Sequence, residues 1–62
     1  MPKHHYLILF EDLGGKFLAD HIWAHNVAQA KTFLRMRAVE QGVQIRQIVA
    51  VVLAGGGNAQ LN

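Results

Sequence analysis

The chain has 62 residues, enough for one small domain, and a formal net charge of +2 from six lysines and arginines against four acidic residues. It contains no cysteine, which excludes disulfides, thiolate zinc sites, iron–sulfur clusters and cysteine nucleophiles. Hydrophobic residues make up 52% of the chain and charged residues only 16%, which favours self-association because a domain this small has little interior in which to bury them.

The first predicted element is a β-hairpin. Two apolar runs, residues 6–10 and 17–23, flank Gly14 and Gly15, and glycine adopts the positive φ that tight turns require. The loop could comprise residues 12–15 or the two glycines alone. Both loops have an even number of residues and place the same side chains on the same faces, whereas a three-residue loop with a bulge would not.

The second predicted element is a helix over residues 27–41. Asn26 is a preferred N-cap, Gln29 three positions later completes a capping-box pattern, and Gly42 is expected at the left-handed position that ends the helix. The stripe expected to face the sheet consists of Val27, Ala30, Phe33, Leu34 and Ala38. Arg37 lies within this stripe, so its guanidinium group must reach solvent or find an acidic partner.

The third predicted strand covers residues 44–54, and a right-handed crossover places it beside the first strand and antiparallel to it. The sequence therefore predicts a single α+β domain over residues 1–54. Its element order is β-β-α-β, with a three-stranded antiparallel sheet in the order 2-1-3 and one helix packed on one face. The glycine-rich residues 55–62 are expected to form a flexible C-terminal tail.

Period-two alternation divides the hairpin into two apolar faces. The first face carries Tyr6, Ile8, Phe10, Phe17, Ala19, His21 and Trp23. The second face carries Leu7, Leu9, Leu18, Asp20 and Ile22. In the third strand, Ile45, Val49, Val51 and Leu53 alternate with Ile48, Ala50 and Val52. One helix covers one face of such a sheet, and the stripe is mainly small and aliphatic, so we expect the helix on the second face. The first face would then form the interface of a homodimer, with Tyr6, Ile8, Phe10, Phe17, His21 and Trp23 as its residues.

The four histidines do not predict a metal site. His21 and His25 have the spacing of two ligands on a helix, but Asn26 caps the helix after both of them. His4 and His21 could share the aromatic face, yet no third ligand joins them there. We therefore expect neither a metal nor another cofactor.

Nucleic-acid binding is the main alternative function. Lys31 and Arg35 lie together on the helix and are the residues we expect to contact an anionic partner, while aromatic side chains of an open sheet could stack on bases. The cations are scattered along the chain, however, and a nucleic-acid-binding domain usually concentrates them. This alternative therefore ranks below protein–protein contact.

An enzymatic alternative depends on the start of the chain. The sequence begins Met1-Pro2, and removal of the methionine would expose Pro2 as an N-terminal secondary amine. This start, followed by a strand, resembles the small tautomerases of the 4-oxalocrotonate type, and the resemblance implies that Pro2 would act as a general base. In that family a helix follows the first strand almost directly, whereas here the Gly14-Gly15 hairpin intervenes, and no arginine falls where a substrate carboxylate would be expected.

Other features favour a non-catalytic protein in the cytoplasm. The chain has no serine, and its one threonine, Thr32, lies in the middle of the predicted helix without a base nearby. Residues 48–54, the longest uncharged apolar stretch, are too few to span a bilayer, and the start lacks the features of a signal peptide. We expect a small homodimeric binding or accessory protein that acts through protein–protein contacts.

Overall fold

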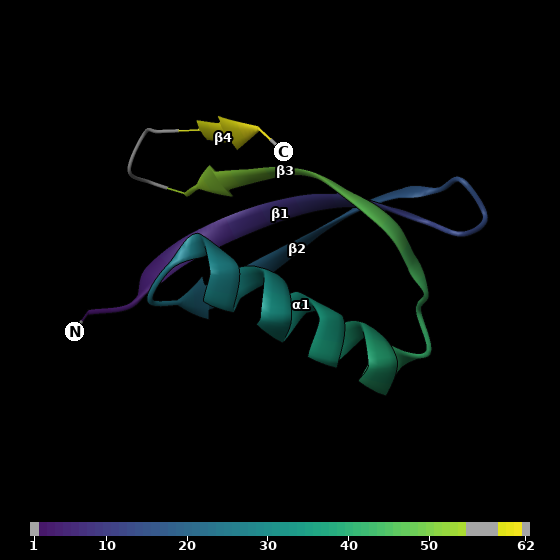
Figure 1. The fold of residues 1–62 in the computed structure, drawn as a ribbon, viewed down its shortest axis with the longest axis horizontal. Coiled ribbons are helices and arrows are strands. Elements are labelled where there is room, and N and C mark those ends of the chain that lie inside the picture. The colour runs from purple at the N-terminus through teal and green to yellow at the C-terminus, as the bar shows by residue number, and fades with distance from the viewer. Residues whose placement is uncertain (1, 55–58, 62) are drawn as a thin grey trace.

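The structure is a computed structural model that describes residues 2–54 and 59–61. Its elements are β1 (His4–Asp12), β2 (Phe17–Ala24), α1 (Val27–Gln41), β3 (Ile45–Leu53) and β4 (Ala59–Leu61). The first three strands form an antiparallel sheet in the order 2-1-3, and α1 lies on one side of it (Figure 1). The predicted β-β-α-β order and strand order are confirmed.

A short fourth strand extends this sheet. β4 pairs antiparallel with β3, so that the strand order of the sheet is β2-β1-β3-β4. The prediction that residues 59–61 belong to a flexible tail is therefore wrong, and the rest of the predicted tail, residues 55–58 and 62, lies outside the described residues. At the opposite end of the sheet, no described strand pairs with the outer edge of β2.

The hairpin loop has three residues, and both predicted loop lengths are wrong. The N–H of Asp12 donates to the carbonyl oxygen of Lys16 at 2.9 Å. The N–H of Gly15 donates to the carbonyl oxygen of Asp12 at 3.1 Å. Gly15 has a φ of 85°, the left-handed conformation that commonly ends a three-residue hairpin loop. The Asp12 carboxylate accepts one more hydrogen bond, from the N–H of Lys16 at 2.9 Å.

This odd loop length exchanges the two faces of β2 relative to β1. Phe10 lies opposite Leu18, and Tyr6 lies opposite Ile22. Because side chains alternate along a strand, a shift of one residue moves every β2 side chain to the other face. The side covered by α1 therefore carries Tyr6, Ile8, Phe10, Leu18, Asp20, Ile22 and Ala24. The prediction that α1 covers the side of Leu7 and Leu9 is wrong.

The N-terminus of α1 has the predicted cap. Asn26 has extended backbone angles, and its side-chain oxygen accepts a hydrogen bond from the N–H of Gln29 at 2.8 Å. In return, the Gln29 side chain accepts from the N–H of His25 at 2.7 Å. These bonds satisfy N–H groups that the first turn of a helix leaves without partners.

The C-terminus of α1 also ends as predicted, at Gly42. This residue has a φ of 73°, and its N–H donates to the carbonyl oxygen of Val39 at 3.2 Å. The next N–H, that of Val43, donates to the carbonyl oxygen of Ala38 at 2.8 Å. The two bonds form a Schellman motif, which requires the left-handed residue that glycine supplies.

Within the described residues, no helix has the length and apolar character needed to cross a membrane.

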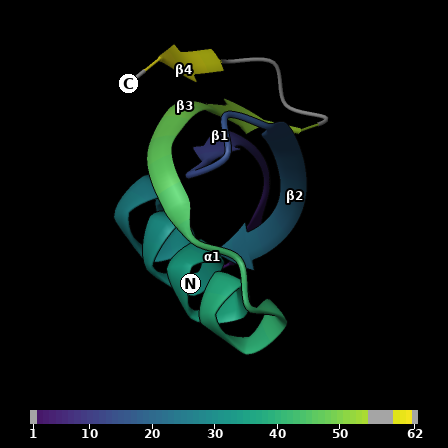
Figure 2. The ribbon, with the colours of Figure 1, turned by 90° about the vertical axis from the view of Figure 1, so that its right-hand side faces the viewer.

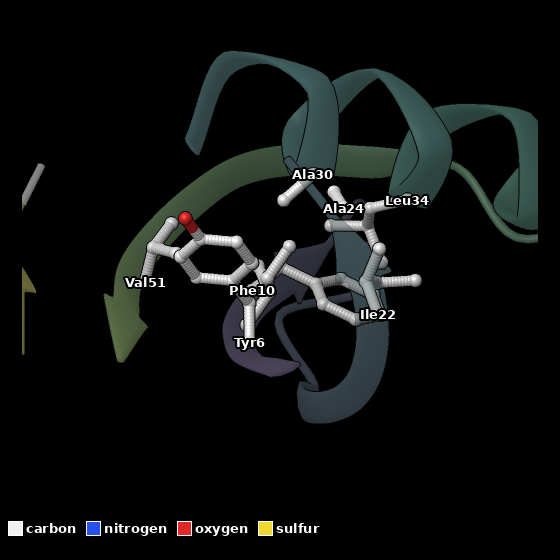
Figure 3. Packing of buried hydrophobic residues seen from close by; sticks show 8 residues of the cluster. Tyr6, Phe10, Ile22, Ala24, Ala30, Leu34 and Val51 are labelled. Atoms are coloured by element: carbon white, nitrogen blue, oxygen red, sulfur yellow. The ribbon is translucent and has the colours of Figure 1, made fainter. Parts of the chain in front are cut away.

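The core lies between α1 and the sheet. Its largest fully buried side chains are Ile8, Leu34 and Val51. Figure 3 shows the rings of Tyr6 and Phe10 gathered with aliphatic side chains beneath α1. The predicted helix stripe is confirmed: Ala30, Leu34 and Ala38 are buried, and Val27 and Phe33 pack against the core.

Two irregularities bend β3 around this core. The register with β1 shifts after Leu9 and again after Glu11, so Val49 and Arg46 have no partner on β1. Such bulges bend a strand and increase its twist. Figure 2 shows the resulting curvature of the sheet, with α1 on its concave side. The core side of β3 consists of Ile45, Ile48, Val51 and Leu53. The predicted strict alternation along β3 is therefore wrong at Ile48.

Candidate functional site

The side of the sheet opposite α1 carries exposed apolar residues, and we call it the open face. It consists of His5, Leu7, Leu9, Phe17, Ala19, His21, Trp23 and Val52. Phe17 is 69% exposed, Trp23 59% and Leu9 38%. The two imidazoles are the polar side chains of this set, and Glu11 adjoins it at the hairpin end. The open face is thus an apolar surface that α1 does not cover.

Three ring side chains form a cluster at one end of the open face. Nε2 of His5 lies 2.7 Å from Nδ1 of His21, so one of these nitrogens donates a hydrogen bond to the other. The Trp23 indole stacks on the His5 ring with a centroid separation of 4.7 Å and an interplanar angle of 11°. The expectation that His4 shares this face with His21 is wrong, because His4 lies edge-on to Tyr6.

Two side chains, those of Asp20 and Arg37, bind the backbone of His21 at the outer edge of β2. Nη1 of Arg37 donates to Oδ1 of Asp20 at 2.9 Å and to the carbonyl oxygen of His21 at 3.1 Å. The same Asp20 oxygen accepts from the N–H of His21 at 3.0 Å. Both backbone groups of His21 therefore have partners, which blocks strand pairing at the middle of this edge. Asp20 is thus the acidic partner of Arg37, whose position within the helix stripe required either such a partner or access to solvent.

The structure divides the predicted interface residues between the core and the open face. Three of them are buried beneath α1, with exposed fractions of 7% or less, and cannot form a contact surface: Tyr6, Ile8 and Phe10. The other three lie on the open face: Phe17, His21 and Trp23. Leu7 and Leu9 join these three, and the even-length loops had assigned both leucines to the covered side. A three-residue loop ending at Gly15 would have revealed them from the sequence.

The residues predicted to contact an anionic partner lie on α1, away from the open face. Arg35 is exposed and Lys31 is half-buried. Figure 2 shows α1 on one side of the sheet. The exposed rings of Phe17 and Trp23 belong to the other side by their strand register. The two cations therefore lie on a different surface from the two rings. A nucleic acid could not contact the cations with its phosphates and stack its bases on the rings at a single surface.

A shallow pocket lies at the other end of β1 from Pro2. It has a volume of about 280 Å³ and is lined by Asp12, Leu13, Gly14, Gly42, Val43 and Gln44. Pro2 is exposed and does not line it; its carbonyl oxygen lies 3.3 Å from Nδ1 of His25. The tautomerase resemblance therefore gains no support from this pocket.

The remaining candidate groups also have structural roles. The Thr32 hydroxyl donates to the carbonyl oxygen of Ala28 at 3.1 Å, within the helix. In the described part of the chain, no three acidic or histidine side chains gather as a set of metal ligands. Comparisons with protein-family models, curated proteins and solved structures found no match for the chain. Its function must therefore be inferred from the open face and the cluster on it.

Proposed function

We propose that this protein is a small, non-catalytic binding protein that works as a homodimer held together by the open face. The observation that carries the proposal is the exposure of two large rings, Phe17 at 69% and Trp23 at 59%, on the side of the sheet that α1 leaves uncovered. Exposed apolar patches on a small soluble domain commonly mark interaction sites. Aromatic residues also dominate the energetics of such contacts.

The area available is compatible with a dimer of moderate affinity. Fully burying an aromatic side chain removes about 150–250 Å², so the exposed parts of Phe17 and Trp23 amount to about 250 Å² in each copy. The four rings of a dimer would then contribute about 12 kcal/mol at 25 cal/mol per Å², against an association cost of about 4–15 kcal/mol. Leu7, Leu9 and Val52 bring the total toward the roughly 1,000 Å² that a stable interface needs.

The chemistry of the open face favours a second copy over a nucleic acid. No lysine or arginine belongs to the open face, so the surface offers no fixed positive charge to neutralise phosphates. Phe17 and Trp23 lie near opposite ends of β2. A second copy placed antiparallel to the first could therefore cover both rings at once.

Sedimentation equilibrium tests the proposal with charged substitutions. The wild type should associate as a dimer at concentrations of about 10–500 μM, the range in which a contact of roughly 5–7 kcal/mol is half-formed. Phe17→Glu and Trp23→Glu should be monomeric there, because each would bury an unpaired carboxylate in the contact. Val39→Glu is the matched control, since Val39 is a 79% exposed apolar residue on α1 and should leave the dimer intact.

Two results would contradict this proposal. The first is a folded wild-type monomer at about 1 mM, well above the expected dissociation constant. The second is salt-sensitive binding of an oligonucleotide by that monomer, weakened by Lys31→Ala or Arg35→Ala, which would support the nucleic-acid alternative.

A further inference from the structure

The histidine pair of the open face brings two ligand nitrogens together from adjacent strands. His5 lies opposite Trp23 in the β1–β2 register, and His21 lies opposite Leu7, so the two imidazoles meet diagonally across the strand pair. Their ring centroids are 4.8 Å apart, and Nε2 of His5 lies 2.7 Å from Nδ1 of His21. Imidazole nitrogen is a common ligand for divalent transition metals.

Both rings are held in place by neighbours. The stacked indole of Trp23 restricts the plane of the His5 imidazole. The backbone of His21 is fixed on its outer side by Asp20 and Arg37 and on its inner side by pairing with β1. The two nitrogens therefore converge before any ion binds, which reduces the ordering cost of binding.

The chemistry of two imidazole ligands indicates which ion fits. In the apo protein one nitrogen carries a proton that the other accepts, and a metal ion can replace that proton and bind both lone pairs. With metal–nitrogen bonds of about 2.0 Å, two ligands at 90° are about 2.8 Å apart, whereas two ligands at the tetrahedral angle are about 3.3 Å apart. The observed 2.7 Å is the length of the hydrogen bond, so the rings must turn toward a common ion for both nitrogens to bind it. Among divalent first-row metals Cu²⁺ binds nitrogen ligands most tightly, and it accepts the 90° angle that requires the smaller change in separation.

We propose that His5 and His21 form a binding site for one Cu²⁺ ion. In the monomer, Nε2 of His5 and Nδ1 of His21 bind the ion at adjacent positions and water fills the others, because His21 is exposed to solvent in the single chain. This proposal does not rest on the homodimer, because both ligands come from the same chain. Since the pair lies on the open face, dimerisation would cover it, and the ion should bind the monomer.

The fluorescence of Trp23 measures binding directly. Trp23 is the only tryptophan in the chain and stacks on a proposed ligand, so bound Cu²⁺ should quench its emission. CuCl₂ is titrated into a His4→Gln background, because the imidazole of His4 is exposed next to His5 in the sequence and offers a competing ligand. In that background His5→Gln and His21→Gln should each weaken binding by about tenfold or more, while His25→Gln, a histidine outside the pair, should leave it unchanged.

Spectroscopy and the Phe17→Glu variant complete the test. Electron paramagnetic resonance should show an axial Cu²⁺ spectrum with coupling to two imidazole nitrogens, and Zn²⁺ should bind more weakly than Cu²⁺. Phe17→Glu, designed to be monomeric, should keep the site, so that failure of the dimer and failure of the metal site are distinguishable. Copper binding that survives both His5→Gln and His21→Gln, or tighter binding of Zn²⁺ than of Cu²⁺, would overturn the proposal.

Discussion

Replacing Arg37 with methionine should destabilise the protein by releasing the contact that covers the edge of β2. The guanidinium group binds both the Asp20 carboxylate and the carbonyl oxygen of His21. Methionine keeps an aliphatic chain to pack beside the apolar helix stripe but has no charge and no donor. The variant should therefore lose the ion pair and leave the His21 carbonyl to water.

The expected cost follows from the exposure of the two partners. The side chains of Arg37 and Asp20 are 44% and 26% exposed, so solvent screening limits their ion pair to about 0.2–1 kcal/mol. The hydrogen bond to the His21 carbonyl adds about 0.5–1 kcal/mol. A total near 1 kcal/mol should lower the melting temperature by about 4–8 °C in a domain of this size.

Thermal unfolding followed by circular dichroism measures this cost, and a double-mutant cycle assigns it to the pair. Asp20→Asn retains an oxygen that can accept from the N–H of His21 but removes the charge. Its coupling with Arg37→Met should be about 0.5–1 kcal/mol and should decrease in about 1 M salt. Arg35→Met is the control, since Arg35 is exposed on the same helix and makes no polar contact with the described part of the chain.

A second consequence concerns the edge itself. Without the guanidinium group, the carbonyl oxygen of His21 is left without its partner on the outer side of β2, so Arg37→Met should form larger species than the wild type while Arg35→Met should not. A coupling energy indistinguishable from zero, together with wild-type sedimentation, would refute the view that this contact protects the edge.

Three further substitutions, each paired with a comparison variant, test the fold by urea denaturation. Ile8→Ala removes a fully buried side chain and should cost about 2–5 kcal/mol. Leu9 is 38% exposed on the other side of the same strand, so Leu9→Ala should cost less than half as much. Equal costs would contradict the assignment of the two faces. Asn26→Ala removes the N-cap acceptor and should cost about 1 kcal/mol, with Asn26→Ser restoring most of it. Gly42→Ala should cost about 1 kcal/mol from backbone strain alone, because the φ of Gly42 is 73° and an added Cβ would meet nothing within 4 Å. Gly14→Ala should cost less, because Gly14 does not have a positive φ.

The helix could be predicted in full because its determinants are local. The cap at Asn26 involves a residue three positions away, and the termination at Gly42 involves carbonyl groups of the last turn. The apolar stripe follows from the 3.6-residue period and needs no knowledge of the partner surface. The strand order could also be predicted, because the handedness of the crossover leaves few alternatives.

The faces of the sheet could not be assigned in this way, because they depend on whether the hairpin loop has an odd or even number of residues. Gly14 and Gly15 indicate a turn under any of the possible loop lengths, but the three-residue loop alone places Phe10 opposite Leu18. That single residue of register moved Tyr6 and Phe10 from the predicted interface into the core.

The composition alone indicates that apolar residues exceed what so small an interior can bury, and the sequence pattern locates one helix and three strands. The chemistry of the surface depends on contacts between residues far apart in the chain. His5 meets His21 across 16 positions, and Arg37 meets Asp20 across 17. Local patterns carry no information about such pairs, because strand register and the placement of the helix on the sheet bring them together.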